Sequence, residues 1–365
     1  MTRLNVRRSG ICLVSLSNNS DHQNTLYSMF SALRKKGYLV YAIGAEGPVA
    51  FNAPCTSDNF YVKCPRRPGI AAGTFDFKAL RALVSVIKST GCQTVYFESV
   101  HLWNCVVMAM LSKTIVKITT LHDVVPHDGS KSVLLCQKLQ SGLSDLVVIK
   151  SPQFREDAKR LYGLRDEQIV DFGVWRAWPE IAPTGGDGSF LFFGRLRKYK
   201  GVSNMLELAH ACPECRFRVV GEPDEESVPL VDELDCLPNV DVVARAVSDE
   251  EMAAAFERSS WVLVPYESAS QSGVIIDAYR YGRPVVAFNV GAIGKQVRDG
   301  ETGLLAPAGD IDSFVACLKR AVALDSRDYS VISRGAFEFG RVTYSADILC
   351  DSFAKTFNVK KKEGQ

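Results

Sequence analysis

Short apolar runs alternate with longer amphipathic stretches along nearly the whole chain of 365 residues. The short runs are rich in Val, Ile, Leu and Phe, as buried strands are, and the longer stretches repeat apolar residues at helical spacing. Strands that alternate with helices predict a parallel sheet covered by helices. We expect strands at 10–16, 38–43, 94–97, 115–120, 145–149, 189–193, 216–220, 240–244, 261–265 and 284–288, and helices at 24–36, 77–89, 152–161, 202–211, 249–258, 275–281 and 311–323.

The alternation stops once, between Arg165 and Gly188, where Gly and Pro accumulate. Such a segment is typical of a linker. We therefore predict an α/β protein with two Rossmann-like, doubly wound domains in series. The predicted parts are a first domain (1–170), a linker (171–188), a second domain (189–340) and a C-terminal helix with a basic tail (341–365), which packs back toward the first domain.

The two halves of the chain also differ in net charge. Residues 1–170 hold 21 Lys and Arg against 12 Asp and Glu, whereas 171–365 hold 22 against 29. A basic half suits an anionic membrane surface, a nucleic acid or an acidic substrate, although scattered solvated charges would give the same count. Two clusters stand out, at Arg34–Lys36 and Arg66–Arg67. No nucleic-acid-binding motif accompanies them, so we expect no nucleic acid partner.

The cysteines and the lengths of the apolar runs indicate where in the cell the protein is expected. Most of the 11 cysteines lie inside apolar runs, which is typical of buried thiols in a reducing compartment. Cys212 and Cys215 form a C-x-x-C without a second pair, so we predict no metal site. The apolar run near the N-terminus is too short for a signal peptide, and no stretch approaches the roughly 20 apolar residues of a membrane span. We expect a cytoplasmic protein, peripheral on the inner face of the cell membrane.

Two segments carry candidate chemistry beyond the ends of predicted strands, where open parallel sheets bind ligands. In FFGRLRKYKGV, Gly194 permits a close turn, and Arg195 and Lys200 can meet the charge of a diphosphate. A solvated basic loop would have the same composition. In the second segment, small residues from Ser268 to Gly273 lead into a helix, whose first amides form an anion site. An ordinary β–α–β unit would also use such turn residues.

These two segments resemble glycosyltransferase family 4, a family of retaining enzymes with the GT-B fold, in which two Rossmann-like domains face a central cleft. The family's G-R-L-x-x-x-K-G motif matches Gly194 to Gly201, and its A-x-x-x-G-x-P-V-V block matches Ala278 to Val286. Its D-G-x-T-G-L-L motif matches Asp299 to Leu305. The resemblance is strong over 189–310 and looser before residue 115. TLHDVVPHDG, which includes His122 and Asp123, is similar to the family's H-D loop.

The resemblance implies roles for particular residues. His122 and Asp123 would be catalytic, with His122 reaching the donor sugar. The donor diphosphate would bind to residues of both segments, and the sugar and ribose would bind to residues of the second segment. The implied diphosphate residues are Gly194, Arg195, Lys200, Ser272 and Gly273, and the implied sugar or ribose residues are Ser270, Gln271 and Asp277.

One position departs from the family. Of its two paired Glu residues, the second falls on Asp277 and the first on Ala269, within an A-S-Q-S-G segment that a branch of the family also carries. We interpret this segment as a variant active site, with donor-sugar identity as the property most affected. Glu267, two residues earlier, is a weaker substitute.

The function implied is transfer of a sugar from a UDP- or GDP-linked donor to a hydroxyl of a glycan or polyprenyl-diphosphate-linked precursor in cell-surface polysaccharide assembly. The resemblance implies a hexosyltransferase that needs no metal and no cofactor, because the leaving diphosphate helps to deprotonate the acceptor. Two alternatives remain open. One is a sugar-nucleotide epimerase or a phosphorylase on a similar scaffold. The other, suggested by Ala269, is a non-catalytic subunit that binds nucleotide sugars. His22, after the first strand, is a further candidate for the cleft, and His127 has weaker support.

Overall fold

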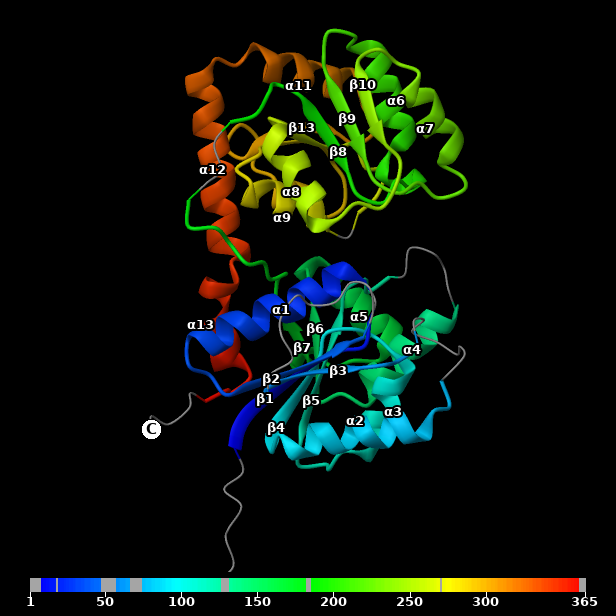
Figure 1. The fold of residues 1–365 in the computed structure, drawn as a ribbon, viewed down its shortest axis with the longest axis vertical. Helices are drawn as coiled ribbons and strands as arrows, with labels where there is room; N and C mark the ends of the chain where they lie inside the picture. The colour runs from blue at the N-terminus through cyan, green and yellow to red at the C-terminus, as the bar shows by residue number, and fades with distance from the viewer. Residues whose placement is uncertain are drawn as a thin grey trace, which may run out of the picture. The chain divides into compact units, whose positions relative to one another are not determined.

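The computed structural model describes residues 8–17, 19–46, 57–65, 74–125, 131–181, 185–269 and 271–360. These residues form two compact units, each built on its own parallel sheet (Figure 1). The N-terminal unit comprises the chain up to Ala177 and from Tyr344 onward, and the C-terminal unit runs from Trp178 to Thr343. The division between Ala177 and Trp178 falls inside the segment predicted to be a linker.

The N-terminal unit holds a seven-stranded sheet in the order β3-β2-β1-β4-β5-β6-β7, with every pair of neighbours parallel. The order reverses direction beside β1, which is the arrangement of a doubly wound sheet. Its strands are β1 (Arg8–Ser15), β2 (Val40–Ala45), β3 (Asn59–Val62), β4 (Cys92–Phe97), β5 (Val116–Leu121), β6 (Leu146–Ile149) and β7 (Ile169–Asp171). Its helices are α1 (Ser20–Lys35), α2 (Phe77–Ser89), α3 (Leu102–Met110), α4 (Lys131–Gly142), α5 (Arg155–Tyr162) and α13 (Ala346–Thr356).

Alternating strand residues bury two separate layers. Ile11 and Leu13 of β1 pack in the core beneath α1 and α13, whereas Cys12 and Val14 pack beneath α2 and α3. The same alternation continues in β6, where Val148 joins the first layer and its neighbours join a cluster with α5. Because successive strand residues point to opposite faces, helices must cover both sides of this sheet.

The C-terminal unit holds a six-stranded parallel sheet in the order β10-β9-β8-β11-β12-β13. Arg283 lies three residues after the end of α9 (Gly273–Arg280). Its guanidinium donates to the carbonyls of Phe256 and Glu257 and so ties the end of α8 (Asp249–Arg258) to this turn. The strands are β8 (Phe190–Phe193), β9 (Phe217–Val220), β10 (Val240–Val243), β11 (Trp261–Val264), β12 (Val285–Asn289) and β13 (Gly303–Pro307). The helices are α6 (Val202–Ala211), α7 (Val228–Asp235), α8 (Asp249–Arg258), α9 (Gly273–Arg280), α10 (Ile293–Gln296), α11 (Ile311–Ala323) and α12 (Ser326–Tyr344).

The predicted fold class is confirmed: both sheets are parallel and covered by helices, and each expected strand and helix has a counterpart. The pattern missed several elements, among them β3, α3, α4, α7, β13 and α12. The Gly- and Pro-rich segment from Arg165 to Gly188 was interpreted as a linker, and the short edge strand β7 near its start was not predicted. A three-residue strand is too short to show the alternation on which the prediction depended.

The predicted cationic cluster Arg34–Lys36, at the end of α1, is paired with carboxylates of its own unit. Arg34 lies 3.0 Å from Asp58, Lys35 lies 3.4 Å from Asp347, and Lys36 lies 2.6 Å from Asp351. The two latter acids belong to α13, which packs against α1. This pairing lowers the positive charge that the cluster offers to a membrane. Arg66 and Arg67 lie outside the described residues.

Candidate active site

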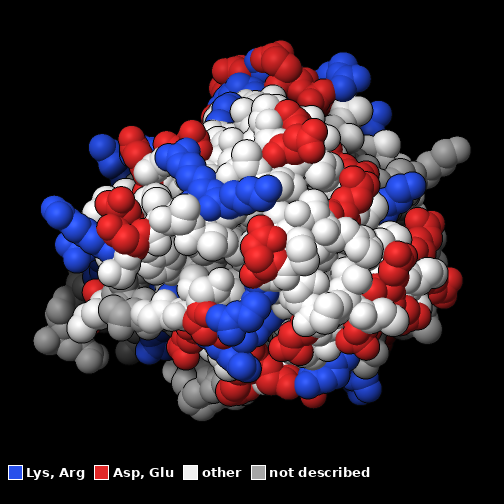
Figure 2. Space-filling model, turned by 90° about the horizontal axis from the view of Figure 1, so that it is seen from above, with Lys and Arg blue, Asp and Glu red and all other residues white. Residues whose placement is uncertain are grey.

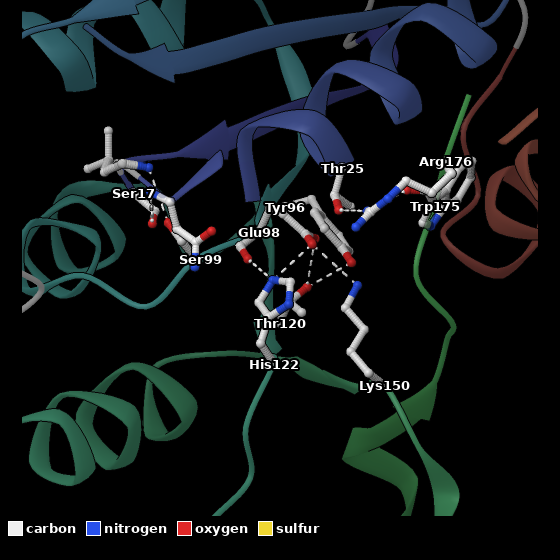
Figure 3. Close-up of polar contacts among 12 residues, drawn as sticks. Ser17, Thr25, Tyr96, Glu98, Ser99, Thr120, His122, Lys150, Trp175 and Arg176 are labelled. Atoms are coloured by element: carbon white, nitrogen blue, oxygen red, sulfur yellow. Dashed lines mark hydrogen bonds and ion pairs between the residues drawn. The ribbon is translucent and has the colours of Figure 1, made fainter. Parts of the chain in front are cut away.

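In the N-terminal unit, three polar side chains meet just beyond the carboxyl ends of neighbouring strands (Figure 3). Glu98 follows β4, His122 follows β5 and Lys150 follows β6. The Glu98 carboxylate lies 3.0 Å from Nε2 of His122 and 3.3 Å from Nζ of Lys150. The Thr120 hydroxyl, 3.2 Å away, donates to the other carboxylate oxygen. Parallel pairing therefore gathers residues that are 24 and 28 positions apart in sequence into one cluster.

The two ionisable groups at the centre of this cluster, Glu98 and Lys150, are buried and have opposite charges. The Glu98 side chain is fully buried and that of Lys150 is 2% exposed, so neither charge is hydrated. Burial alone would raise the pKa of Glu98, but Lys150 and His122 outweigh it and lower that pKa to about 2. Burial lowers the pKa of Lys150, and Glu98 opposes this effect. Glu98 is thus held as a carboxylate, and it fixes the ammonium and the imidazole beside it.

His122 is held on two sides. Nε2 also lies 2.8 Å from the backbone carbonyl of Glu98, and the ring of His22, from α1, stacks on the His122 ring at 3.9 Å between centroids. An Nε2 that faces a carboxylate and a carbonyl must carry a proton, since both partners only accept hydrogen bonds. The structure therefore brings together His122 and His22, both candidates from the sequence.

Asp123 follows His122 directly. Its side chain is exposed, and its backbone carbonyl accepts a hydrogen bond from Nε2 of Gln137 at 2.8 Å. The ion pairs of the buried cluster involve Glu98, His122 and Lys150 and leave the Asp123 carboxylate at the surface. His127 lies outside the described residues.

In the C-terminal unit, the predicted diphosphate residues lie beyond β8. Gly194 has a φ of +107°, and a Cβ there would come within 3.0 Å of Nζ of Lys200. Lys200 in turn lies 5.5 Å from the centre of the Tyr266 ring, a cation–π contact with the segment after β11. Arg195 is exposed, and none of the ion pairs among the described residues involves it. Two cations thus occupy the carboxyl end of the central strand.

The segment after β11 leads to the start of α9, and the Gln296 side chain and the loop after β12 hold it in place. The amide of Ser272 donates to Oε1 of Gln296 at 2.7 Å, and Nε2 of Gln296 donates back to the Ser272 carbonyl at 3.1 Å. Gly291, with a φ of +52°, allows the loop after β12 to contact the carbonyl of Ala269, where a Cβ would collide. The buried hydroxyl of Ser272 has no hydrogen-bond partner among the described residues.

The other predicted residues of this unit lie close by along the chain. Gly273 is the first residue of α9, and Asp277, one turn further, lies 3.4 Å from Arg280 with its side chain 14% exposed. Gln271 is half-buried in the turn before α9. Glu267 is exposed and accepts a hydrogen bond from Ser203 at 3.4 Å. Ser270 lies outside the described residues.

Part of the family-like string has a structural role. The Asp299 carboxylate accepts a hydrogen bond from the amide of Leu305, and the Thr302 hydroxyl contacts the Tyr279 hydroxyl at 2.8 Å. These contacts tie the turn before β13 to α9. Residues 299–305 thus hold the turn before β13 against α9.

The cluster of potential metal ligands found among the described residues comprises Cys212, Glu214 and Cys215. These residues lie between α6 and β9, at the amino end of the strand, whereas Arg195 lies at the carboxyl end of its neighbour β8. Burial raises the pKa of both thiols, that of Cys215 to about 12, which disfavours the thiolates that metals bind.

Comparison with known proteins gives a family match over part of the chain and a match of the whole fold. Residues 187–323 match the family model described as Glycosyl transferases group 1. The structure is similar to Anabaena HepE in complex with UDP, with a TM-score of 0.72, 14% identity and coverage of 96% of this chain and 99% of that one. It is also similar to sucrose-phosphate synthase from Thermosynechococcus elongatus, with a TM-score of 0.73, 18% identity and coverage of 96% and 98%. Two parallel-sheet Rossmann-like domains that match these structures define the GT-B fold.

Two curated relatives have the same name. The D-inositol 3-phosphate glycosyltransferase of Mycobacterium avium is 28% identical over 172 residues, which are 46% of this chain and 40% of the relative. That of Rhodococcus jostii is 31% identical over 148 residues, or 37% of this chain and 33% of the relative. The chain therefore matches less than half the length of either relative. Among the described residues, no helix has the length and apolar character needed to cross a bilayer.

Sequence reasoning missed Glu98 and Lys150. Both stand directly after segments that were correctly predicted as strands, 94–97 and 145–149. A charged residue at the carboxyl end of a buried strand was the available signal, because such positions face the ligand side of a parallel sheet.

Proposed function

We propose that this protein is a retaining, metal-independent glycosyltransferase. It moves a sugar from a nucleotide-diphosphate donor to a hydroxyl of a glycan or lipid-linked glycan precursor. The observation that carries the proposal is the family match over residues 187–323, which spans the loops after β8, β11 and β12. These three strands are neighbours in the C-terminal sheet, so their loops lie along one edge.

The chemistry of that edge suits a nucleotide diphosphate. Arg195 offers a planar fork of donors, Lys200 a point charge, and the first amides of α9 a further anion site. Charge develops on the diphosphate as the sugar leaves, and fixed cations and amides stabilise it without reorganisation. Asp277, on the same helix, is the proposed partner of ribose hydroxyls, since a carboxylate accepts their hydrogen bonds. The donor would be UDP- or GDP-linked; HepE was solved with UDP.

His122 is the proposed partner of a hydroxyl of the donor sugar. Glu98 and His22 fix its ring, which leaves the other ring nitrogen to interact with substrate. The leaving diphosphate would accept the proton of the acceptor hydroxyl on the same face of the sugar, which accounts for retention without a pair of catalytic carboxylates. The acceptor proposed is a glycan or a polyprenyl-diphosphate-linked precursor at the inner face of a membrane.

Donor binding and product analysis test this proposal. The full chain is titrated by calorimetry with UDP, GDP and their sugars, and the nucleotide that binds is then offered with candidate acceptors. We expect one nucleotide to bind and the product to keep the anomeric configuration of the donor, as read by the proton coupling at the anomeric carbon. A changed sugar nucleotide without acceptor would indicate an epimerase. Binding without turnover on any acceptor would indicate the non-catalytic subunit.

A further inference from the structure

Helices α2, α3 and α4 lie side by side on one face of the N-terminal sheet (Figure 1). Nε1 of Trp103, in α3, donates to the carbonyl of Thr74, just before α2, at 2.9 Å. On the other side of α3, Nδ2 of Asn104 donates to Oε1 of Gln140 in α4 at 3.3 Å. Helices α1 and α13 cover the opposite face of the sheet. The surfaces of α2, α3 and α4 that point away from the sheet therefore lie on the same side of the N-terminal unit.

The outer surfaces of α3 and α4 are apolar. Val106 and Met110 of α3, four residues apart, are 36% and 41% exposed. Leu135, Leu139 and Leu143, in and just after α4, repeat every four residues and are 58%, 46% and 41% exposed. Residues four apart share one side of a helix. We call these five side chains the α3–α4 apolar face. Phe75 and Phe77, at the start of α2, are exposed as well.

Exposed cations outnumber exposed acids around this face, where Asp76, just before α2, and Asp145, two residues after Leu143, are the nearby acids in sequence. The sequences of α2, α3 and α4 contain no Asp or Glu. Exposed cations come from α2, from the turn after α3 and from α4. They are Lys78, Arg81, Lys88, Lys113 and Lys138. The surface drawn in Figure 2 differs, because there Lys and Arg are interspersed with Asp and Glu. The Arg34–Lys36 cluster differs too, since each of its cations has a carboxylate partner.

We propose that the α3–α4 apolar face and its surrounding cations dock the protein on an anionic lipid bilayer. Apolar side chains that project from a surface helix enter the boundary between headgroups and acyl chains, and Lys and Arg beside them attract anionic headgroups. A second copy of the chain would bring two surfaces of the same charge together, which disfavours a dimer through this face. The inference rests on the proposed function only in taking a membrane as the place where the acceptor lies. Docking itself requires neither the donor nucleotide nor sugar transfer, so it can be tested separately.

Vesicle binding tests the inference. The full chain, without donor, is sedimented with sucrose-loaded vesicles of phosphatidylcholine alone and of phosphatidylcholine with phosphatidylglycerol, at low and physiological salt. We expect binding to the anionic vesicles only. Leu135→Gln with Leu139→Gln should weaken it at least about ten-fold by removing inserted side chains. Lys113→Glu with Lys138→Glu should weaken it by a similar factor, and more at low salt.

Matched variants locate the effect. Val331→Gln with Val342→Gln changes two exposed apolar residues of α12, and Lys35→Glu with Lys355→Glu makes the same change of charge on α1 and α13. Both should bind as the parent does. Unchanged binding of the α3–α4 variants, or an equal loss in the matched variants, would overturn the inference. So would a dimer, seen by analytical ultracentrifugation, that only the α3–α4 variants dissociate. Melting temperature confirms folding, and calorimetry with nucleotide reports separately on the proposed function.

Discussion

The two candidate sites use charge in opposite ways. In the N-terminal unit, Glu98 and Lys150 are buried as an ion pair, with the partly buried His122 beside the same carboxylate. In the C-terminal unit, Arg195 is exposed, and Lys200 rests on an aromatic ring beside a glycine turn. A buried, compensated cluster has little net charge to offer and instead fixes the geometry of a side chain. Exposed cations at a strand end offer charge to a ligand that supplies the negative partner.

The largest effect that this comparison predicts is on stability. Lys150→Met removes the ammonium and leaves the Glu98 carboxylate buried without its main counter-charge. Breaking a buried pair in this way costs about 3–5 kcal/mol. We expect the free energy of unfolding in urea to fall by that order. Lys35→Met, which breaks the exposed pair with Asp347, is the matched control and should cost less than about 1 kcal/mol. Similar losses in both variants would refute the contrast.

The second effect is on donor binding. Arg195→Ala and Lys200→Ala should each weaken nucleotide-diphosphate binding by roughly 2–5 kcal/mol if the bound phosphates are desolvated, because a charge pair then loses one partner. Calorimetry with the nucleotide measures this, and thermal unfolding should change little for Arg195→Ala because that side chain is exposed. Arg197→Ala, two residues on, is a control of the same charge. Unchanged affinity in both variants would reject the assignment of the diphosphate site.

The sequence predicted the cations of the C-terminal site but missed two of the three residues of the N-terminal cluster, for a physical reason. Arg195 and Lys200 stand in one continuous turn, so local spacing reveals them. Glu98 and Lys150 meet only because β4, β5 and β6 are neighbours, and strand order depends on long-range packing that no local pattern encodes. His122 was predicted through its resemblance to the H-D loop, but its partner was not. The short elements β3 and β7 were missed because four and three residues show little periodicity.

A smaller effect concerns pH. Since the pKa of Glu98 is lowered to about 2 from its ordinary value near 4.5, the ionised carboxylate stabilises the folded state above pH 4.5. That contribution is lost as the pH falls from 4.5 toward 2. Glu98→Gln should therefore show a weaker decline of unfolding free energy over this range than the parent. Equal acid dependence of the two proteins in urea titrations would show that Glu98 titrates normally.

A more local effect separates turnover from binding. His122→Ala should reduce kcat by roughly 10- to 100-fold, the size expected for one lost hydrogen bond to a charged or reacting group. Nucleotide affinity should stay within about two-fold, because the proposed phosphate contacts belong to the other unit. His210→Ala, which changes an exposed histidine on α6, is the control. Normal turnover of His122→Ala would remove this residue from the mechanism.

The smallest effect expected is that of chelation, which should leave activity within about two-fold of the untreated enzyme. A divalent cation that bridges a diphosphate to a protein usually takes one or two carboxylate ligands. In the proposed site, Arg195, Lys200 and the first amides of α9 would neutralise the phosphates without a metal. The potential ligand cluster at Cys212, Glu214 and Cys215 lies at the amino edge instead. Initial rates are compared in EDTA, in Mg²⁺ and in Mn²⁺. Activity that EDTA abolishes and Mg²⁺ or Mn²⁺ restores would show that a metal, and not Arg195 and Lys200 alone, meets the charge of the leaving diphosphate.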